Sequence, residues 1–430
     1  MELRVEKIVY PGRALARAEG KIVFTDEGLP GELVEVEILK NKKNYAEART
    51  IKILEPSADR QLPRCSHYQA CSLYQIMTYD LELKTKQAQL LEIFSGFYGS
   101  DRPPLELIPS PQIYGYRNKI RLSFNWQAQP PFVAYHEPGS MASFLPVESC
   151  ALVSDRVNAL ISRFNTLLRG EPHPALRHLE IRESFWSGEL LLLLEAADED
   201  SLERVAHLWL PALTMNSPLA GVVGLVQEGR RKFFSRLYGR DYLEEKVGPV
   251  VFRYGAGSFF QVNPSQLEIV VEKIKQHLQP QTPVKLIDLY AGLGTFGLLL
   301  SGSASEVMAI ESDPGNIFFL KKNLRLNHIQ HLVVAEGRSE DWIDEILEFR
   351  AGALVIDPPR KGMAEELVEA LVSHPPGLVF YLSCNPTTLA RDLKKFLQAY
   401  ELLEIIGFDF FPRTPHLETL AVLKARTPVH

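Results

Sequence analysis

The chain is poor in cysteine, has no long apolar run and carries no excess of positive charge. Only four cysteines occur among its 430 residues, too few for a disulfide scaffold, which indicates a reducing compartment. No apolar run reaches the roughly 18 residues that suggest a membrane-spanning helix, so we predict none. The formal net charge of −6 excludes a uniformly basic surface but allows local basic faces that bind nucleic acid.

What is present is typical of a folded protein with several domains. Hydrophobic residues make up 46% of the chain and charged residues 23%, which argues against disorder. The amino terminus, Met1 to Lys7, lacks the basic then apolar pattern of a secretory signal, so we expect a cytoplasmic protein. The length suggests two or three domains. No motif reports on oligomeric state, and we expect a monomer.

The first domain is predicted over residues 1–58. Short strands alternate with turns there, and residues 32–39 alternate apolar and polar side chains, so we predict a small OB-like β-barrel. Residues 40–45 form a basic loop with one aromatic. Two interpretations of this loop stay open: a grip on the RNA backbone, or the solvated tip of a hairpin.

Two further segments separate this barrel from the last third of the chain. Residues 59–111 read as a linker that carries Cys65 and Cys71 and a helix. A lone pair of cysteines at this spacing is only a weak metal signal. Residues 112–255 read as a mixed α+β insert, whose basic cluster near Arg117 and aromatic Trp126 suit the lining of a cleft.

Residues 256–430 alternate strands and helices, which predicts a Rossmann-like, doubly wound α/β sheet. A strand ends at Tyr290 before a Gly-x-Gly turn, and the next strand ends in Glu311, where an acid can bind both hydroxyls of a ribose. The third glycine of the dinucleotide fingerprint is missing. The pattern therefore favours an adenosine without phosphates, the shape of S-adenosylmethionine.

Three more polar residues stand at predicted strand ends. Asp357 begins the turn Asp357–Gly362, Cys384 follows the apolar run 377–382, and Glu418 begins the last strand. In an open α/β sheet the carboxyl ends of the strands are where ligands bind, so a thiol at Cys384 can meet a substrate. Taken alone, a free cysteine is more often a small buried hydrophobe, and Asp357 and Glu418 would be ordinary turn residues.

Five sequence blocks together resemble one family. These blocks are Ser258–Asn263, Asp288–Tyr290 with its Gly-x-Gly turn, Asp357–Arg360, Ser383–Pro386 and His416-x-Glu418. In this order they are similar to the S-adenosylmethionine-dependent RNA 5-methyluridine methyltransferases, in particular the bacterial type that acts on 23S ribosomal RNA and carries a TRAM barrel.

The resemblance implies a role for each site residue. Gln261, Tyr290, Glu311 and Asp357 would bind the methyl donor, S-adenosylmethionine. Cys384 would be the nucleophile that adds to carbon 6 of uracil, which makes carbon 5 able to attack the methyl group. Glu418 would then remove the proton from carbon 5. The uracil must lie in a single-stranded loop or be flipped out of a stack.

One departure concerns a metal site. Family members with an iron–sulfur cluster use Cys-x5-Cys-x2-Cys and a distant fourth cysteine. Here Cys65, Cys71 and Cys150 match that pattern, but Tyr74 stands at the third ligand position. A phenolate replaces a thiolate poorly on iron. A cluster with an unusual ligand, a labile cluster and no cluster all stay open.

The substrate and the activity each leave alternatives. We expect ribosomal RNA, because the barrel with its cysteine-bearing linker resembles the ribosomal RNA enzymes; a transfer RNA uridine-5 methyltransferase is the second candidate. A catalytically inactive RNA-binding or chaperone protein is the third. That last interpretation predicts loss of Cys384 or Glu418, and both residues are present.

Overall fold

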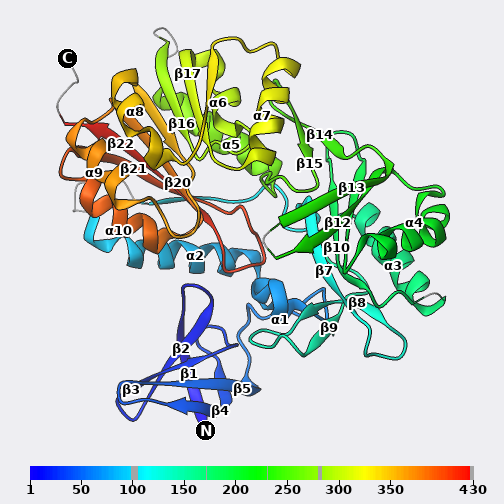
Figure 1. Cartoon of the computed structure of the whole chain (residues 1–430). Helices are drawn as coiled ribbons and strands as arrows, with labels where there is room; N and C mark the ends of the chain where they lie inside the picture. Colours follow the sequence, from blue (N-terminus) through cyan, green and yellow to red (C-terminus); the bar gives the residue numbers. More distant parts are fainter. Residues whose placement is uncertain (98–104, 171, 230, 279–282, 427–430) are drawn as a thin grey trace.

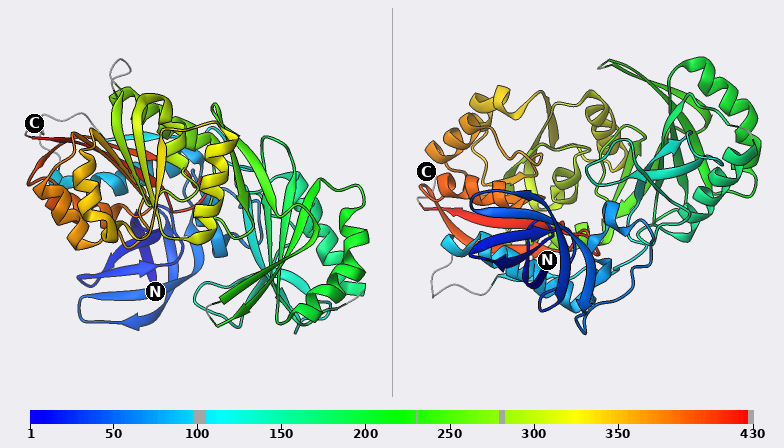
Figure 2. Two further views of the ribbon diagram at one scale, coloured as in Figure 1. Left: turned by 45° about the horizontal axis from the view of Figure 1, so that its top comes forward. Right: turned by 90° about the horizontal axis from the view of Figure 1, so that it is seen from below.

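The computed structural model describes residues 1–97, 105–170, 172–229, 231–278 and 283–426. Figure 1 shows three parts: a small barrel at the amino terminus, a central domain with α3 and α4 at its outer side, and a larger α/β domain that contains the end of the chain. The views in Figure 2 show the barrel beneath the α/β domain and beside α2. Among the described residues, no helix combines the length and the apolar character needed to span a membrane.

The amino-terminal barrel is closed by five strands in the order β1-β2-β3-β5-β4, which confirms the predicted OB-like barrel. Its strands are β1 (Glu2–Val9), β2 (Arg13–Ala18), β3 (Lys21–Thr25), β4 (Leu33–Asn41) and β5 (Tyr45–Glu55). Val34 and Val36 point into the barrel, while Glu35 and Glu37 face solvent, as the period-two pattern requires. The basic loop, residues 42–44, is an exposed hairpin tip, which agrees with both interpretations.

The central domain is a seven-stranded sheet in the order β13-β12-β11-β10-β7-β8-β9. Its strands are β7 (Lys119–Asn125), β8 (Phe132–His136), β9 (Phe144–Pro146), β10 (Leu176–Glu183), β11 (Leu190–Ala196), β12 (Leu219–Glu228) and β13 (Arg231–Gly239). Helices α3 (Asp155–Gly170) and α4 (Glu199–Thr214) pack on one face, where Phe164 and the fully buried Trp209 join one core with the sheet.

The α/β domain is an eight-stranded sheet in the order β18-β17-β16-β19-β20-β22-β21-β6, which confirms the Rossmann-like prediction. Its strands are β6 (Glu106–Ile108), β16 (Val284–Leu289), β17 (Ala304–Glu311), β18 (Leu332–Glu336), β19 (Ala353–Ile356), β20 (Leu378–Ser383), β21 (Tyr400–Phe408) and β22 (Glu418–Ala425). The strands from β18 to β20 are parallel, and β22 runs antiparallel to both of its neighbours.

Helices cover both faces of this sheet and divide its core in two. The helices of the domain are α2 (Tyr79–Ile93), α5 (Pro264–His277), α6 (Thr295–Leu299), α7 (Pro314–Leu326), α8 (Ile343–Phe349), α9 (Glu365–Ser373) and α10 (Pro386–Phe396). Apolar side chains of α5, α6 and α7 form the core on one face, and those of α2, α8, α9 and α10 form the core on the other.

The linker is part of this domain in space. Its helix α2 packs against α10, and its strand β6 is the outermost strand of the sheet, beside β21. The hairpin β14 (Tyr242–Val247) with β15 (Val250–Gly255) also packs on the α/β domain, through α5 and α7. Segments from three regions of the chain therefore build the domain that holds the predicted site.

Four buried charged side chains tie α2 to the segment before β22, and we call them the α2 ion cluster: Glu82, Lys86, Asp409 and Arg413. Lys86 Nζ lies 2.8 Å from Glu82 Oε1 and 2.6 Å from Asp409 Oδ1, and Arg413 Nη1 lies 3.1 Å from Glu82 Oε2. Two cations thus balance two anions. Because all four are buried, the cluster fixes the path of the chain that leads into β22.

Candidate active site

The predicted site residues meet at one edge of the eight-stranded sheet. Tyr290, Asp357 and Cys384 each follow directly on a strand (β16, β19 and β20), and Glu311 is the last residue of β17. Glu418 is the first residue of β22, whose antiparallel direction brings its start to the same edge. The carboxyl ends of parallel strands are the usual ligand-binding edge of such sheets.

The glycine-rich turn after β16 cradles the acid of β17. Tyr290, Gly292 and Gly294 all have positive φ, and a Cβ at Gly294 would collide with Leu320, so this turn requires glycine there. The backbone N–H of Gly292 donates to Glu311 Oε2 at 2.8 Å. The N–H groups of Ser312 and Asp313 donate to the other oxygen, Oε1, at 2.9 and 2.7 Å. The carboxylate of Glu311 is therefore held in one orientation.

A cavity of about 380 Å³ opens beside this acid. It is lined by Tyr290, Ile310, Glu311, Ser312, Gly337, Arg338, Ser339, Glu340, Pro359 and Lys361. The volume lies within the usual range of small-molecule sites. An aromatic ring, an oriented carboxylate and backbone groups around one hollow fit the adenosine part of S-adenosylmethionine.

Asp288 binds the start of the helix that follows the glycine-rich turn. It is fully buried, and its Oδ2 accepts the N–H of Gly297 at 2.7 Å. Burial raises its pKa to about 7, and the carboxylates of Asp357 and Glu311 add to this effect while the Gly297 bond opposes it. Asp288 thus links β16 to α6.

Gln261 and Asp357 come from distant segments and touch. Gln261 Nε2 donates to Asp357 Oδ2 at 3.1 Å. The loop of Gln261 is anchored by the central domain, because Asn118 Nδ2 donates to the Gln261 carbonyl at 2.9 Å and Arg182 Nη1 donates to the Ser258 carbonyl at 2.6 Å. Burial raises the pKa of Asp357 to about 7 despite the bond from Gln261.

Cys384 and Glu418 face each other across two paired strands. Ser383 lies opposite Thr419 in the β20–β22 ladder, so the next pair in this register is Cys384 with Glu418. The side chain of Asn385 accepts the N–H of Thr387 at 3.2 Å and caps α10, so Cys384 lies in the short connection between the end of β20 and the start of α10. Glu418 is buried, and its Oε2 has no hydrogen-bond partner among the described residues.

Burial and mutual repulsion favour the neutral forms of this pair. Burial raises the pKa of Cys384 to about 11, with further contributions from the carboxylates of Glu418 and Asp357. Burial also raises the pKa of Glu418 well above its ordinary value, and Asp357 adds to the shift. The positive charge of Arg360 opposes both pKa shifts.

Two residues near this pair were not assigned a role from the sequence. Arg360 was visible as part of the Asp357–Arg360 motif, and its carbonyl accepts the side-chain N–H of Asn385 at 3.2 Å. Tyr10 lies in the turn between β1 and β2, and its pKa is raised first by burial and then by the charges of Cys384 and Glu418. From the sequence, the turn around Tyr10 indicated only a connection between two strands.

The turn of Tyr10 brings the barrel to the active site. A Cβ at Gly12 would lie 2.6 Å from Pro415 Cγ, so the turn packs closely on the segment that leads to Glu418. Only glycine allows this approach at the φ of +100° found there. The barrel is therefore part of the wall of the site.

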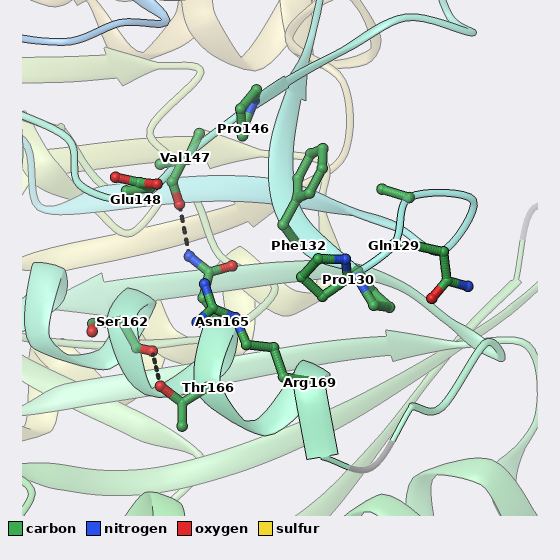
Figure 3. Close-up of a pocket in the computed structure, with 12 residues that line it drawn as sticks. Gln129, Pro130, Phe132, Pro146, Val147, Glu148, Ser162, Asn165, Thr166 and Arg169 are labelled. Atoms are coloured by element: carbon green, nitrogen blue, oxygen red, sulfur yellow. Dashed lines mark hydrogen bonds between the residues drawn. The ribbon is translucent and has the colours of Figure 1, made fainter.

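A second cavity, of about 480 Å³, lies in the central domain between α3 and the β8–β9 region (Figure 3). Asn165 donates to the Val147 carbonyl at 2.9 Å, and Thr166 donates to the Ser162 carbonyl at 3.0 Å, so these polar side chains serve the fold. None of the predicted site residues lines this cavity, and we assign it no chemistry.

The structure brings together two of the three cysteines predicted as metal ligands. The sulfurs of Cys65 and Cys150 and a ring nitrogen of His67 lie within 4.8 Å of one another, and Cys71 lies outside this group. Tyr74 points elsewhere: its hydroxyl accepts from Gln89 Nε2 of α2 at 2.9 Å. His67 was not predicted, because one histidine near two cysteines gave no distinct spacing.

The strand order, the glycine-rich turn and the oriented acid of β17 define the class of S-adenosylmethionine-dependent methyltransferases. Comparison with known proteins narrows the class. The family model described as tRNA (Uracil-5-)-methyltransferase matches residues 78–426, and the TRAM domain model matches residues 1–51. The chain belongs to this family of RNA (uracil-5-)-methyltransferases and is an S-adenosylmethionine-dependent enzyme, which confirms the resemblance.

Individual relatives span the whole chain. An uncharacterized RNA methyltransferase of Synechocystis sp. is 33% identical, over 99% of this chain and 96% of its own. One of Clostridium tetani is 29% identical, over 96% and 93%. The crystal structure of the Pyrococcus abyssi tRNA (uracil-54, C5)-methyltransferase in complex with S-adenosyl-L-homocysteine shares the fold, with a TM-score of 0.78 and 23% identity over 98% of this chain and 100% of that one.

Proposed function

We propose that this enzyme methylates carbon 5 of a uridine in ribosomal RNA through a covalent bond between Cys384 and carbon 6 of the base. The observation that carries this proposal is the placement of Cys384 directly after Ser383 and of Glu418 directly before Thr419, because Ser383 and Thr419 form the last pair of the β20–β22 ladder. This placement puts the nucleophile Cys384 next to the buried carboxyl group of Glu418 at the ligand-binding edge of the sheet. Among the described residues, Glu418 Oε2 has no hydrogen-bond partner.

Four residues hold the methyl donor in this proposal. The oriented carboxylate of Glu311 binds the ribose hydroxyls, and the ring of Tyr290 lines the cavity for the adenine. Gln261 and Asp357, which contact each other, would bind the part of the donor that carries the methyl group. When bound, S-adenosylmethionine supplies a methyl group on a positively charged sulfur. A neighbouring carboxylate at Asp357 stabilises that charge.

Cys384 and Glu418 perform the chemistry on uracil. The thiolate of Cys384 adds to carbon 6, and the electron pair of the 5,6 double bond moves toward carbon 5, which then takes the methyl group. Carbon 5 now carries both a methyl group and a hydrogen. Glu418 removes that hydrogen as a proton, the double bond re-forms and the thiolate of Cys384 leaves. A carboxylate with a raised pKa is a stronger base than an exposed glutamate, which suits this step.

Arg360 and Tyr10 support the substrate side of the site. Arg360 lowers the pKa of Cys384 against the effects of burial and of the nearby carboxylates, so it favours the reactive thiolate. Tyr10 offers an aromatic ring from the barrel beside the same pair. An aromatic ring near an unstacked base is a common element of RNA recognition.

The nature of the RNA is the finer part of the proposal. The barrel and cysteine-bearing linker favoured ribosomal RNA at the level of sequence. The fold does not distinguish ribosomal from transfer RNA as the substrate, because the Pyrococcus abyssi tRNA (uracil-54, C5)-methyltransferase shares it over 98% of this chain. Transfer RNA is therefore the second candidate, and the test uses both RNAs.

The test is covalent trapping. The protein is incubated with S-adenosylmethionine and with ribosomal or transfer RNA that contains 5-fluorouridine, and the products are separated on a denaturing gel. Fluorine at carbon 5 cannot be removed as a proton, so we expect a stable protein–RNA adduct. Peptide mapping should locate the bond at Cys384, and Cys384→Ala should form no adduct.

One control and the choice of RNA decide between the possible outcomes. RNA with ordinary uridine should give methylated product without a stable adduct. The RNA that is trapped names the substrate class: an adduct with transfer RNA alone overturns the ribosomal assignment but keeps the chemistry. An adduct that persists in Cys384→Ala, or methylation without any adduct, contradicts the covalent mechanism.

A further inference from the structure

The cysteine corner between the linker and the central domain contains more donors than the family pattern suggests. We use this name for Cys65, His67, Cys71 and Cys150. Cys65, His67 and Cys150 are all buried, at 5%, 1% and 1% exposure. One donor atom from each lies within 4.8 Å of the others. The corner joins two segments that are far apart in the chain.

The imidazole of His67 indicates that this group binds a ligand. His67 Nε2 is buried and has no hydrogen-bond partner among the described residues. A buried ring nitrogen without a partner is costly, and histidine is the commonest metal ligand in proteins. The backbone N–H of Ala151 donates to Cys65 Sγ at 3.1 Å, and Gln75 Nε2 donates to the same sulfur at 3.5 Å. Such donors stabilise a thiolate.

An iron–sulfur cluster does not fit these residues. A cubane cluster places each thiolate on a different iron around four irons and four sulfides, so its ligands must surround a wide space. Here the Sγ atoms of Cys65 and Cys150 lie within 4.8 Å of each other. The residue at the third ligand position, Tyr74, has its hydroxyl bound to Gln89 and its ring packed with Ile8, Ile76 and other apolar residues beneath the barrel.

A single small ion fits better. Zinc is bound tetrahedrally with bonds of about 2.3 Å to sulfur and about 2.0 Å to nitrogen, which calls for donor atoms that lie close together. Cys71 is the fourth candidate donor. It is the last residue of the short helix α1 (Tyr68–Cys71), four residues after His67, and its side chain would have to turn toward the other three donors to complete the site.

Arg117 balances the charge of such a site. Its backbone N–H donates to the Leu152 carbonyl at 2.9 Å, so it lies beside the segment of Cys150. Its Nε is buried without a hydrogen-bond partner among the described residues. Three thiolates and a neutral imidazole around Zn²⁺ leave one negative charge, which one guanidinium neutralises.

We propose that Cys65, His67, Cys71 and Cys150 bind one zinc ion rather than an iron–sulfur cluster. The ion would fix the linker to the central domain and so hold the elements around the RNA-binding side of the enzyme. Zinc is redox-inactive, and therefore the site would be structural. This proposal is independent of the chemistry of Cys384.

Metal analysis of the purified full-length protein tests the proposal. We expect about one zinc and no iron or sulfide per chain, and a colourless protein. After removal of zinc by a chelator, Co²⁺ should bind and give the intense visible bands of a tetrahedral thiolate site. Reconstitution with iron and sulfide that yields a stable brown protein would overturn the proposal, as would failure to bind either Zn²⁺ or Co²⁺.

Variants assign the ligands. His67→Gln should weaken zinc binding at least about tenfold, since even the loss of an outer partner of a ligand has an effect of this size. Cys384→Ser is the matched control, because it removes a cysteine far from the corner, and it should retain a full zinc ion. Equal zinc content in His67→Gln and the parent protein contradicts the assignment. If Cys65→Ser fails to fold, the Co²⁺ spectrum of the parent protein still shows whether thiolates bind the metal.

Discussion

Two groups of buried charges in the α/β domain differ in one respect. In the α2 ion cluster every charge has an opposite charge within 3.1 Å. In the candidate active site Asp288 accepts one backbone N–H, Asp357 accepts the amide of Gln261, and Glu418 Oε2 has no hydrogen-bond partner among the described residues. Burial raises the pKa of all three carboxyl groups.

Burial also raises the pKa of Glu82 in the ion cluster to about 7, although Lys86 and Arg413 oppose the shift. The two groups therefore differ in ion pairing: the cluster acids have cations within 3.1 Å, whereas the three active-site acids form no ion pair among the described residues.

This difference in ion pairing suits the α2 ion cluster to holding the chain in place and the active-site carboxyl groups to proton transfer. A buried ion pair fixes geometry, because the loss of one partner leaves the other charge uncompensated, whereas a buried carboxyl group without an ion pair is free to exchange a proton with a substrate. The two groups are also connected. Asp409 and Arg413 of the ion cluster precede Glu418 on the same segment, so the paired charges hold the chain that presents the unpaired one.

The largest effect is expected from Glu418→Gln. Loss of a general base typically costs about 10²–10⁴-fold in rate. Stability should not fall, since the change removes a buried acid that has an unpartnered oxygen. Turnover is measured with tritiated methyl donor, and unfolding by urea. The variant should also accumulate its covalent adduct on ordinary uridine RNA, because release of Cys384 requires the proton transfer. Undiminished turnover would remove Glu418 from the mechanism.

Breaking the paired group should act on stability instead. Lys86→Met leaves Glu82 and Asp409 buried with only Arg413 to balance them, and we expect the free energy of unfolding to fall by about 3–5 kcal/mol. Denaturant titration followed by circular dichroism measures the change. Lys7→Met, which breaks only the exposed bridge to Glu92, is the control and should cost less than about 1 kcal/mol. Equal effects of the two variants would refute the contrast.

The raised pKa of Asp288 makes the stability of the folded protein depend on pH. Its pKa is about 7 in the folded protein and near 4 when unfolded, so the folded state binds the extra proton between these values. The stability it contributes is present below pH 4 and is lost as the pH rises through 7. Asp288→Asn should therefore match the parent protein at low pH and exceed it at pH 8, by up to about 4 kcal/mol. Urea midpoints across pH check this; a variant less stable at pH 8 contradicts it.

The smallest effect is expected at the contact between Gln261 and Asp357. In our proposal Gln261, which contacts Asp357, also gives the donor one hydrogen bond worth about 0.5–1.5 kcal/mol, so Gln261→Ala should weaken binding of S-adenosylhomocysteine about 2–12-fold. Calorimetry measures the affinity. Gln112→Ala, a change outside the donor cavity, serves as the control. A loss much beyond this range would mean that Gln261 contacts the donor in other ways too.

The sequence predicted those features that depend on local patterns. Alternation over residues 32–39 indicated the barrel, and the spacing from Tyr290 to Glu311 indicated the donor-binding turn. Partners far apart in the chain were out of reach. No pattern around Lys86 predicts its ion pair with Asp409, and no pattern around Tyr10 predicts that it lies near Cys384. Strand β6 likewise carries no sign that it completes a sheet built mostly from the last third of the chain.

The ladder between β20 and β22 also bears on how this enzyme tolerates change in length. Side chains alternate between the two faces of a sheet, so deletion of one residue inside β22 would turn Glu418 away from Cys384. The geometry of the proposed catalytic pair thus depends on a strand register. Insertions should be accepted in surface loops such as residues 42–44, while the β20 and β22 segments must keep their length for the enzyme to act at all.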